Sequence, residues 1–509
     1  MRVNIAMGGR SMISVIAMVA GITLAASGQS GQGPMVPIPT RSAAQVRLDA
    51  LDPVFAAGTE GAFAKENLPS FSTFVLSNGI PVVLRTNEAN RVRSLSIVLR
   101  GGTLITSPDE AGIESLMLRE MARGSREWPY ARLAAKLDET SASFSTGSVF
   151  EYSTYTLSCL DRYFDELLPI WAGTFDDPAW DPGDFDRVLS DAKLALQKKE
   201  QDPWQATATE MNKDFFAGHP YAATPDGTLD SLAKLDLAKV KARYAATLSA
   251  NRLFIVAVGN FDSASLKYEL EKAFGSIKDL RLELPSGAPA FEGAVKAGLV
   301  KKTFPASKGV AYLRGDFAAP SPTAPDWAAA SLAARLYSDL LFNVVRDKYG
   351  AAYTPSAVVR AFGSNYGSIS VYKTSVPDKI KSYLDEAAAE LAAGQAMSVA
   401  PKADEGRSPR ASIAEVLPIY KTIYINESYG KITTNAAVAG EIARSVVEFG
   451  DPRAWLLDVD RVASVSADQI EKAFEKYFVA APVLWVALGP AEMLDQFKES
   501  DFKGLGQSR

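Results

Sequence analysis

The second half of the chain carries an arginine and a tyrosine whose spacing suits binding of a carbonyl oxygen. Arg346 falls near the end of an apolar helical stretch, and Tyr353 follows where a strand is expected to start. A guanidinium and a phenol can both donate hydrogen bonds to one oxygen, which is how an oxyanion is stabilised. Gly350 between them is the left-handed residue expected at a helix end. The alternatives are an ion pair of Arg346 with a nearby acid and packing of Tyr353 within a sheet.

Few residues could support metal or acid–base chemistry. The single histidine, His219, lies in a Gly-His-Pro-Tyr segment, so no pair of histidine ligands can be formed. We expect His219 to bond nearby backbone, with a pH switch or a base as the alternative. Glu110 and Glu114 are spaced to chelate, but we expect a solvated acidic helix start. The single cysteine, Cys159, permits no intramolecular disulfide and is expected to be a small buried hydrophobe.

Two stretches of the chain share one order of elements, from 71 to about 277 and from 299 to about 497. Each ends with a helix followed by an apolar strand that a glycine terminates, at 251–259 and 482–489. The repetition predicts an α+β fold of two homologous mixed-sheet/helix sandwich domains.

In the first stretch, the pattern predicts a hairpin about Asn78-Gly79 and a strand at 95–99. A helix is expected to begin at Ser107–Glu110, with a polar cap and a proline in its first turn, and to end at Gly124. Further helices are expected at 130–137, 163–174, 182–200 and 237–244.

The segment after Gly101-Gly102 carries Ala111-Gly112-Ile113 and continues to Met121. This frame resembles the pitrilysin or insulinase-type zinc metallopeptidase family, which includes mitochondrial processing peptidase. Its members place Ala-Gly-Leu-x-His-x-x-Glu-His on the first helix after a Gly-Gly turn. The resemblance covers about residues 71–497 and implies a half-length unit, one half of a clam-shell.

The residues at the metal-binding positions of this frame are Ser115, Leu118 and Arg119. A serine hydroxyl is a poor zinc ligand, leucine cannot act as a base, and a guanidinium stays protonated and repels the ion. The family's third ligand, a glutamate, would fall within 188–195, where Asp191 is the only acid. We therefore predict a zinc-motif-lacking member with no metal site and no cofactor of its own.

The resemblance also implies two substrate-facing features. Arg346 and Tyr353 match the family motif Arg-Glu-x-x-Gly-Leu-Ala-Tyr, with Asp347 in place of the glutamate. In the family this arginine and tyrosine bond substrate backbone across the chamber from the zinc. Ser143, Phe144 and Ser145 occupy the place of the strand to which substrate adds as an extra strand, although an ordinary edge strand is the alternative.

These features predict a non-catalytic subunit that binds extended, unfolded peptides. It would supply Arg346 and Tyr353 to a separate zinc-bearing subunit of the family in a heterodimer, and zinc is expected only in that partner. The alternative is a stand-alone peptide-binding or scaffold protein of the cell envelope, possible as a homodimer. An active zinc metalloendopeptidase would need ligands that the sequence lacks.

The domain boundaries that we predict begin with a signal peptide at 1–28 and a flexible tether at 29–68. A first domain at 69–285, a linker at 286–298 and a second domain at 299–499 follow, with an insertion near 394–412. The apolar run at 12–26 is about 15 residues, shorter than the roughly 20 of a membrane-spanning helix, although an uncleaved anchor is the alternative.

The signal predicts an exported protein, periplasmic or associated with the cell envelope, without a membrane span after its removal. The 509 residues carry a net charge of −5, which offers no basic field for nucleic acid.

Overall fold

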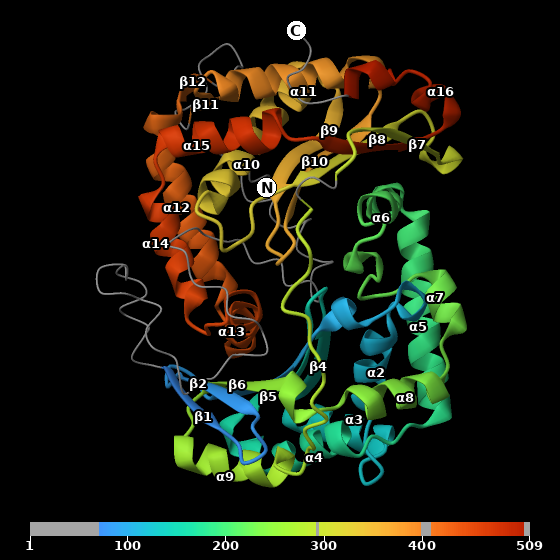
Figure 1. The fold of residues 1–509 in the computed structure, drawn as a ribbon, viewed down its shortest axis with the longest axis vertical. Helices are drawn as coiled ribbons and strands as arrows, with labels where there is room; N and C mark the ends of the chain where they lie inside the picture. The colour runs from blue at the N-terminus through green and yellow to red at the C-terminus, as the bar shows by residue number, and fades with distance from the viewer. Residues whose placement is uncertain (1–70, 292–294, 399–408, 503–509) are drawn as a thin grey trace, which may run out of the picture.

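A computed structural model describes residues 71–291, 295–398 and 409–502. The chain forms two lobes, each built on one mixed β-sheet (Figure 1). The strand order is β1-β2-β6-β3-β5-β4 in the N-terminal sheet and β7-β13-β8-β10-β9 in the C-terminal sheet. From β2 and from β7 onward the two orders correspond strand for strand, so the predicted α+β fold with two homologous sandwiches is confirmed. The predicted signal and tether, 1–28 and 29–68, lie outside the described residues.

Both sheets combine one parallel pair with antiparallel neighbours: β2 runs parallel to β6, and β7 parallel to β13. The N-terminal strands are β1 (Phe71–Val75), β2 (Pro81–Thr86), β3 (Val92–Arg100), β4 (Ser143–Ser148), β5 (Tyr152–Leu160) and β6 (Leu253–Gly259). The C-terminal strands are β7 (Gly298–Thr303), β8 (Ala311–Ala318), β9 (Ala352–Val359), β10 (Tyr366–Thr374) and β13 (Val483–Gly489). The hairpin predicted about Asn78-Gly79 joins β1 to β2, and the predicted apolar strands are β6 and β13.

Each sheet buries one face against helices of its own repeat. In the N-terminal repeat the helices are α2 (Ile113–Met121), α3 (Tyr130–Thr140), α4 (Phe164–Asp176), α5 (Pro182–Gln201), α7 (Leu229–Lys234), α8 (Leu237–Thr247) and α9 (Ser263–Phe274). In the C-terminal repeat they are α10 (Trp327–Leu341), α11 (Pro377–Ala392), α12 (Ile413–Lys431), α14 (Leu457–Ser464), α15 (Ala467–Phe474) and α16 (Ala491–Leu494).

The first helix begins later than the sequence predicted. Pro108–Glu110 forms a separate 3₁₀ turn, and α2 starts only at Ile113 and ends at Met121. Gly112 separates the two because its φ is +89°, a left-handed value, and a Cβ there would lie 3.0 Å from the Asp226 carbonyl oxygen. The close approach of the segment before α7 therefore sets where α2 begins.

The opposite faces of the sheets are covered by helices exchanged between the repeats. The sequence did not predict these two helices, α6 (Pro203–Phe215) and α13 (Asn435–Phe449). α6 belongs to the N-terminal repeat and packs on β8 and β13, whereas α13 belongs to the C-terminal repeat and packs on β3 and β6. Figure 1 shows α13 over the lower sheet and α6 beside the upper one. One face of each sheet is therefore covered by a helix of the other repeat.

The interface between α13 and the N-terminal sheet is apolar on both the helix and the sheet. Val98 and Val256 of the sheet meet Ile442 and Val446 of the helix in one buried cluster. At the start of α13, the Asn435 side chain donates to the Val92 carbonyl at 2.6 Å. This contact fixes the first turn of α13 against the start of β3.

A buried polar joint links the two lobes and the segment between them. The Glu151 carboxylate accepts hydrogen bonds from the Tyr221 hydroxyl at 2.9 Å and from the Gly363 N–H at 3.2 Å. The Pro289 carbonyl accepts from the Ser364 hydroxyl, and His219 Nε2 lies 2.8 Å from the same oxygen. Because His219 Nδ1 accepts from the Tyr221 N–H, its Nε2 is the protonated nitrogen that donates. The interpretation of His219 as a backbone-bonded loop residue is confirmed.

Part of the insertion predicted near 394–412 is ordered structure. β11 (Gln395–Met397) and β12 (Arg410–Ser412) form a two-stranded antiparallel sheet, and 399–408 lie outside the described residues. Across the described part of the chain, no helix has the length and apolar character needed to cross a membrane.

The packing of α13 on the N-terminal sheet can be tested by creating a cavity beneath this helix. Ile442 is fully buried against the N-terminal sheet, so Ile442→Ala should lower the free energy of unfolding by about 2 to 5 kcal/mol. Ile419→Ala, on α12 where the side chain is 41% exposed, should change it by less than about 0.5 kcal/mol. Urea unfolding followed by circular dichroism measures both. Equal effects of the two substitutions would contradict a packed interface between the repeats.

Candidate functional site: a metal motif without ligands and an arginine–tyrosine pair

Solvent reaches α2 at one narrow strip. Seven of its nine residues are buried, and only Ser115 and Arg119, one helical turn apart, are partly exposed. Leu118 between them is completely buried in the core of the N-terminal repeat. The accessible part of the helix therefore coincides with two of the three positions that the sequence assigned to the lost metal motif.

Glu114 was predicted to be solvated, and this prediction is wrong. The side chain is buried and forms an ion pair with Arg252, which is itself fully buried. Arg243 lies 3.8 Å from the same carboxylate oxygen, and Arg252 Nε donates to the Arg100 carbonyl at 2.7 Å. The reason is the late start of α2, which places Glu114 in the first buried turn of the helix. Glu110, on the preceding 3₁₀ turn, is exposed as expected.

A second buried acid lies at the end of α2. Glu120 is 1% exposed, and its Oε2 has no hydrogen-bond partner in the described chain. Burial, reinforced by the negative charge of Asp184, raises the pKa of Glu120 to about 7, although Arg123 opposes the shift. Arg123 is itself paired with Asp184 at 2.8 Å. This acid could not be predicted from the sequence, because nothing in the neighbouring residues indicated that α2 would be covered on nearly all sides.

The residues at the family's metal positions do not fit a zinc ion. Ser115 and Arg119 replace the two imidazoles, and Leu118 offers no base. Asp191, the only acid in the predicted segment of the third ligand, lies on α5 and is exposed. Within 71–291, 295–398 and 409–502, no group of three or more His, Cys, Asp or Glu side chains is arranged to hold a metal. Cys159 is buried, and burial raises the pKa of its thiol to about 12, consistent with a structural role.

The segment predicted to be an edge strand forms β4, at the edge of the N-terminal sheet. β4 carries Ser143, Phe144 and Ser145 and pairs only with β5 among the described strands. Phe144 anchors it by an edge-on contact with the buried Tyr155 ring, at 6.4 Å between centroids. The outer side of β4 makes no backbone hydrogen bond with any other described segment. Its donors and acceptors are therefore available to an added strand.

Arg346 and Tyr353 form a contacting pair. The Arg346 Nη1 donates to the Tyr353 carbonyl at 3.0 Å, and the guanidinium carbon lies 4.8 Å from the Tyr353 ring centroid and 4.7 Å from that of Phe342. No carboxylate of the described chain pairs with Arg346, so the predicted alternative of a local ion pair is not observed. Tyr353 is 61% exposed, and its hydroxyl has no partner in the same residues.

Local backbone geometry presents this pair. After α10 the chain widens into a π-helical turn, Phe342–Lys348, and Gly350 with φ +58° ends it as predicted. Ala351 N then donates to the Val345 carbonyl at 2.8 Å, which leads the chain directly into β9. The turn and the strand thus place the guanidinium beside the aromatic ring.

The structure brings together some of the predicted residues and separates others. α2 contacts β4, so the helix that bears Ser115 and Arg119 lies beside the edge strand that bears Ser143 to Ser145. α2 otherwise packs mainly on α5 and α8 of its own repeat, whereas the turn of Arg346 packs on α10, α11 and β9. The two predicted halves of the site therefore belong to different lobes.

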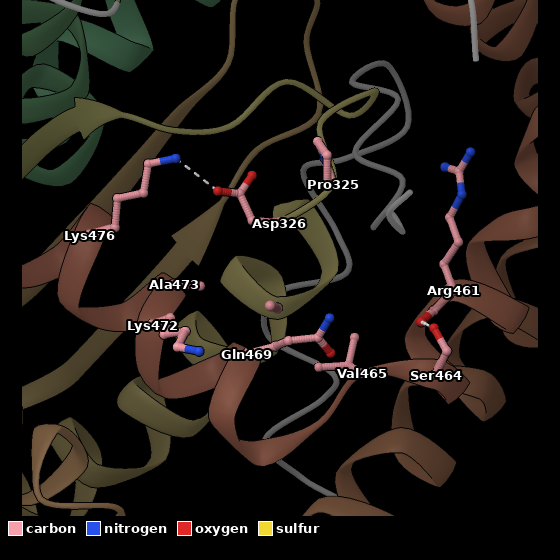
Figure 2. A pocket seen from close by; sticks show the side chains of 10 residues that line it. Pro325, Asp326, Arg461, Ser464, Val465, Gln469, Lys472, Ala473 and Lys476 are labelled. Atoms are coloured by element: carbon pink, nitrogen blue, oxygen red, sulfur yellow. Dashed lines mark hydrogen bonds and ion pairs between the residues drawn. The ribbon is translucent and has the colours of Figure 1, made fainter. Parts of the chain in front are cut away.

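A surface pocket elsewhere in the C-terminal repeat contains none of the predicted residues. It lies between the start of α10 and helices α14 and α15, and Figure 2 shows Asp326 and Lys476 on one side with Arg461 on the other. Lys476 is paired with Asp326 at 2.9 Å, and Lys472 with Asp468 at 2.7 Å. These lysines are already neutralised by neighbouring acids, so we assign no ligand to the pocket.

Together, the repeated sandwiches and the helix that follows the Gly-Gly turn define a half-length peptidase-like unit. Two family descriptions match adjoining parts of the chain: "Insulinase (Peptidase family M16)" over residues 81–227 and "Peptidase M16 inactive domain" over 234–398. The chain belongs to the M16 (insulinase) peptidase family, and the resemblance noted in the sequence is confirmed.

Two relatives are informative. The non-peptidase homolog YmxG of Helicobacter pylori is 23% identical over 181 residues, which cover 36% of this chain and 42% of that protein. The match thus spans less than half the length of that relative. The β subunit of the mitochondrial-processing peptidase of Blastocladiella emersonii is 19% identical over 452 residues, or 85% of this chain and 91% of that subunit.

Solved structures share the fold. A peptidase M16 inactive domain from Pseudomonas fluorescens aligns with a TM-score of 0.68 and 18% identity, covering 83% of this chain and 98% of that chain. A chain of complex III2 from Candida albicans aligns with a TM-score of 0.67 and 15% identity, covering 85% of this chain and 98% of its own length.

The raised pKa of Glu120 predicts a stability that depends on pH. A carboxyl whose folded pKa is raised stabilises the fold fully below its unfolded pKa, near 4.3, and this contribution is lost as the pH rises through about 7. Glu120→Gln removes the ionisation, so the variant should exceed the wild type by about 1 to 3 kcal/mol at pH 8 and equal it near pH 4.5. Urea unfolding at several pH values measures this difference. Glu110→Gln, at an exposed position, is the control, and a Glu120→Gln difference that is constant with pH would contradict the assignment.

Proposed function

We propose that this protein is a non-catalytic M16 subunit that binds extended, unfolded peptides and acts in proteolysis with a zinc-bearing family member. In the proposed heterodimer, the partner holds the metal and this chain contributes Arg346 and Tyr353 to the substrate wall opposite it. The observation that carries the proposal is the exposed Arg346–Tyr353 pair on a chain whose own metal positions hold Ser115, Leu118 and Arg119.

The electrostatics of the pair support this role. Within the described chain, the guanidinium has no acid partner, and one of its N–H groups donates to the Tyr353 carbonyl. Its remaining donors and the exposed phenol can bond one substrate oxygen as negative charge develops on it. A pair fixed in advance by the π-helical turn needs little reorganisation when substrate arrives.

The relatives support the same assignment. One is named a non-peptidase homolog, and another is a subunit of a processing peptidase. A chain of a multisubunit complex shares the fold. We extend these properties to the present chain as part of the proposal, together with export to the periplasm or cell envelope.

The proposal is tested by mixing this protein with a zinc-bearing family member. The isolated protein should bind no stoichiometric zinc and should leave an unstructured peptide library intact, whereas addition of a zinc-bearing M16 subunit from the same organism should give cleavage. Arg346→Ala should lower kcat/KM of the mixture by about a hundredfold, mainly through kcat, because the lost hydrogen bonds form most strongly in the transition state. Tyr353→Phe should act in the same direction, and Arg346→Lys should restore only part of the rate because it lacks the planar fork.

Arg91→Ala is the matched control, because the side chain of this arginine is 80% exposed and pairs with Asp161 at the surface. It should leave the rate of the mixture unchanged. Stoichiometric zinc and cleavage by the isolated chain would overturn the proposal. So would a mixture whose activity is indifferent to both Arg346→Ala and Tyr353→Phe.

A second candidate function is a stand-alone peptide-binding or scaffold protein, which the open outer side of β4 favours. It predicts peptide binding by a homodimer or monomer without any zinc-bearing partner. Light scattering of the purified chain with and without peptide, together with the mixing experiment, separates the two.

A further inference from the structure

The exposed strip of α2 has unusual chemistry for a helix that is otherwise in the core. Ser115 and Arg119 are its only solvent-reaching residues, and they lie on one face because they are four residues apart. Neither side chain makes a hydrogen bond or ion pair with the described part of the protein. The strip therefore offers a hydroxyl and a guanidinium, side by side, with free donors.

The positive charge of Arg119 is not balanced locally. The other arginines about α2 are matched with acids: Arg123 with Asp184 at 2.8 Å, and Arg252 with Glu114. Glu120, which follows Arg119, is buried and forms no ion pair with it, and no other carboxylate of the described residues lies within ion-pair distance of Arg119. A partly covered guanidinium with five donors and no acceptor is a site for an external anion.

The helix that bears this strip contacts a strand that can hold a peptide. α2 packs against β4, and Figure 1 shows the helix next to that strand at one side of the lower lobe. β4 has one open side and no proline, whereas the corresponding edge strand of the other repeat, β9, contains Pro355. A peptide added to β4 as a further strand would run past the exposed strip of α2.

We infer that the replaced metal motif is a carboxylate-binding site for extended peptides. In this arrangement the Arg119 guanidinium donates to a carboxylate on a peptide paired with β4, and the Ser115 hydroxyl donates to the same group. The carboxylate is either the C-terminus of the peptide or an acidic side chain. This inference rests on the peptide-binding part of the proposed function and names the substrate class.

A structural role for Arg119 has a different signature. As a cation in the last turn of α2, it also interacts favourably with the negative end of the helix dipole. That role predicts a small loss of stability on substitution and no effect on the choice of peptide. Ligand preference therefore separates the two roles.

The experiment measures binding of fluorescent unstructured peptides to the full-length protein by anisotropy. The peptides have one sequence in four forms: a C-terminal acid without other acids, the same peptide amidated, the amidated peptide with one internal glutamate, and an acid form with alternate backbone N-methylation. The wild type should bind the acid form roughly tenfold to a hundredfold more tightly than the amide. N-methylation should abolish binding because it removes the donors that pair with β4.

Arg119→Gln should bind the acid and amide forms equally, at the affinity of the wild type for the amide. Arg119→Lys should keep a reduced preference for the acid, because it retains the charge without the fork. Arg91→Gln should behave as the wild type. Tight binding of the internal-glutamate amide identifies a side-chain carboxylate as the ligand, and its weak binding identifies the C-terminus.

Equal affinity of the wild type for the acid and amide forms, or an unchanged preference in Arg119→Gln, would overturn the inference. If the mixture with a zinc-bearing subunit still depends on Arg346, the proposed function survives that result. Binding of none of the peptides, together with an inactive mixture, would reject both.

Discussion

The reciprocal exchange of α6 and α13 is the packing on which the two-lobed structure depends. A half-buried sheet exposes an apolar face, and here each such face is covered by a helix that belongs to the other repeat. The lobes are consequently not independent units joined by a linker. The Glu151, Tyr221 and Ser364 joint lies on the same boundary and adds buried hydrogen bonds that only one relative placement of the lobes can satisfy. The relative position of α2, β4, Arg346 and Tyr353 follows from this packing.

Buried contacts hold α2 in place on several sides. The Glu114–Arg252 pair beneath the helix, Gly112 before it and α5 beside it together hold α2 against the edge strand. Removing one partner of this buried pair would leave an uncompensated charge in the core and would destabilise the fold. The helix is thus held rigidly, with Ser115 and Arg119 as its partly exposed residues.

Local patterns of residues predicted the repeated order of elements, the β1–β2 hairpin and the helix end at Gly350, whereas the edge strand β4 and the Arg346 and Tyr353 motif were implied by the family resemblance. The sequence-based prediction was wrong where contacts between distant residues determine the structure. Gly112 delays the start of α2 where the segment before α7 approaches it, and this late start places Glu114 in a buried turn, where Arg252, distant in the sequence, pairs with it. α6 and α13 look like ordinary amphipathic helices, and their own residues do not indicate that their apolar faces cover the sheet of the other repeat. The open state of Arg119 likewise depends on which acids its neighbours occupy.

The π-helical turn at Phe342–Lys348 has a consequence for how this chain can change. A π-turn holds one residue more than the α-helical turn it replaces, so it is equivalent to a single-residue insertion. Deleting one residue there would restore regular helical phase and rotate every later side chain of the turn by about 100°. The core of α10 precedes the turn and would keep its register, while Arg346 would turn away from Tyr353. A change of one residue in the length of this turn would therefore alter the geometry of the Arg346–Tyr353 pair while leaving the packing of α10 unchanged.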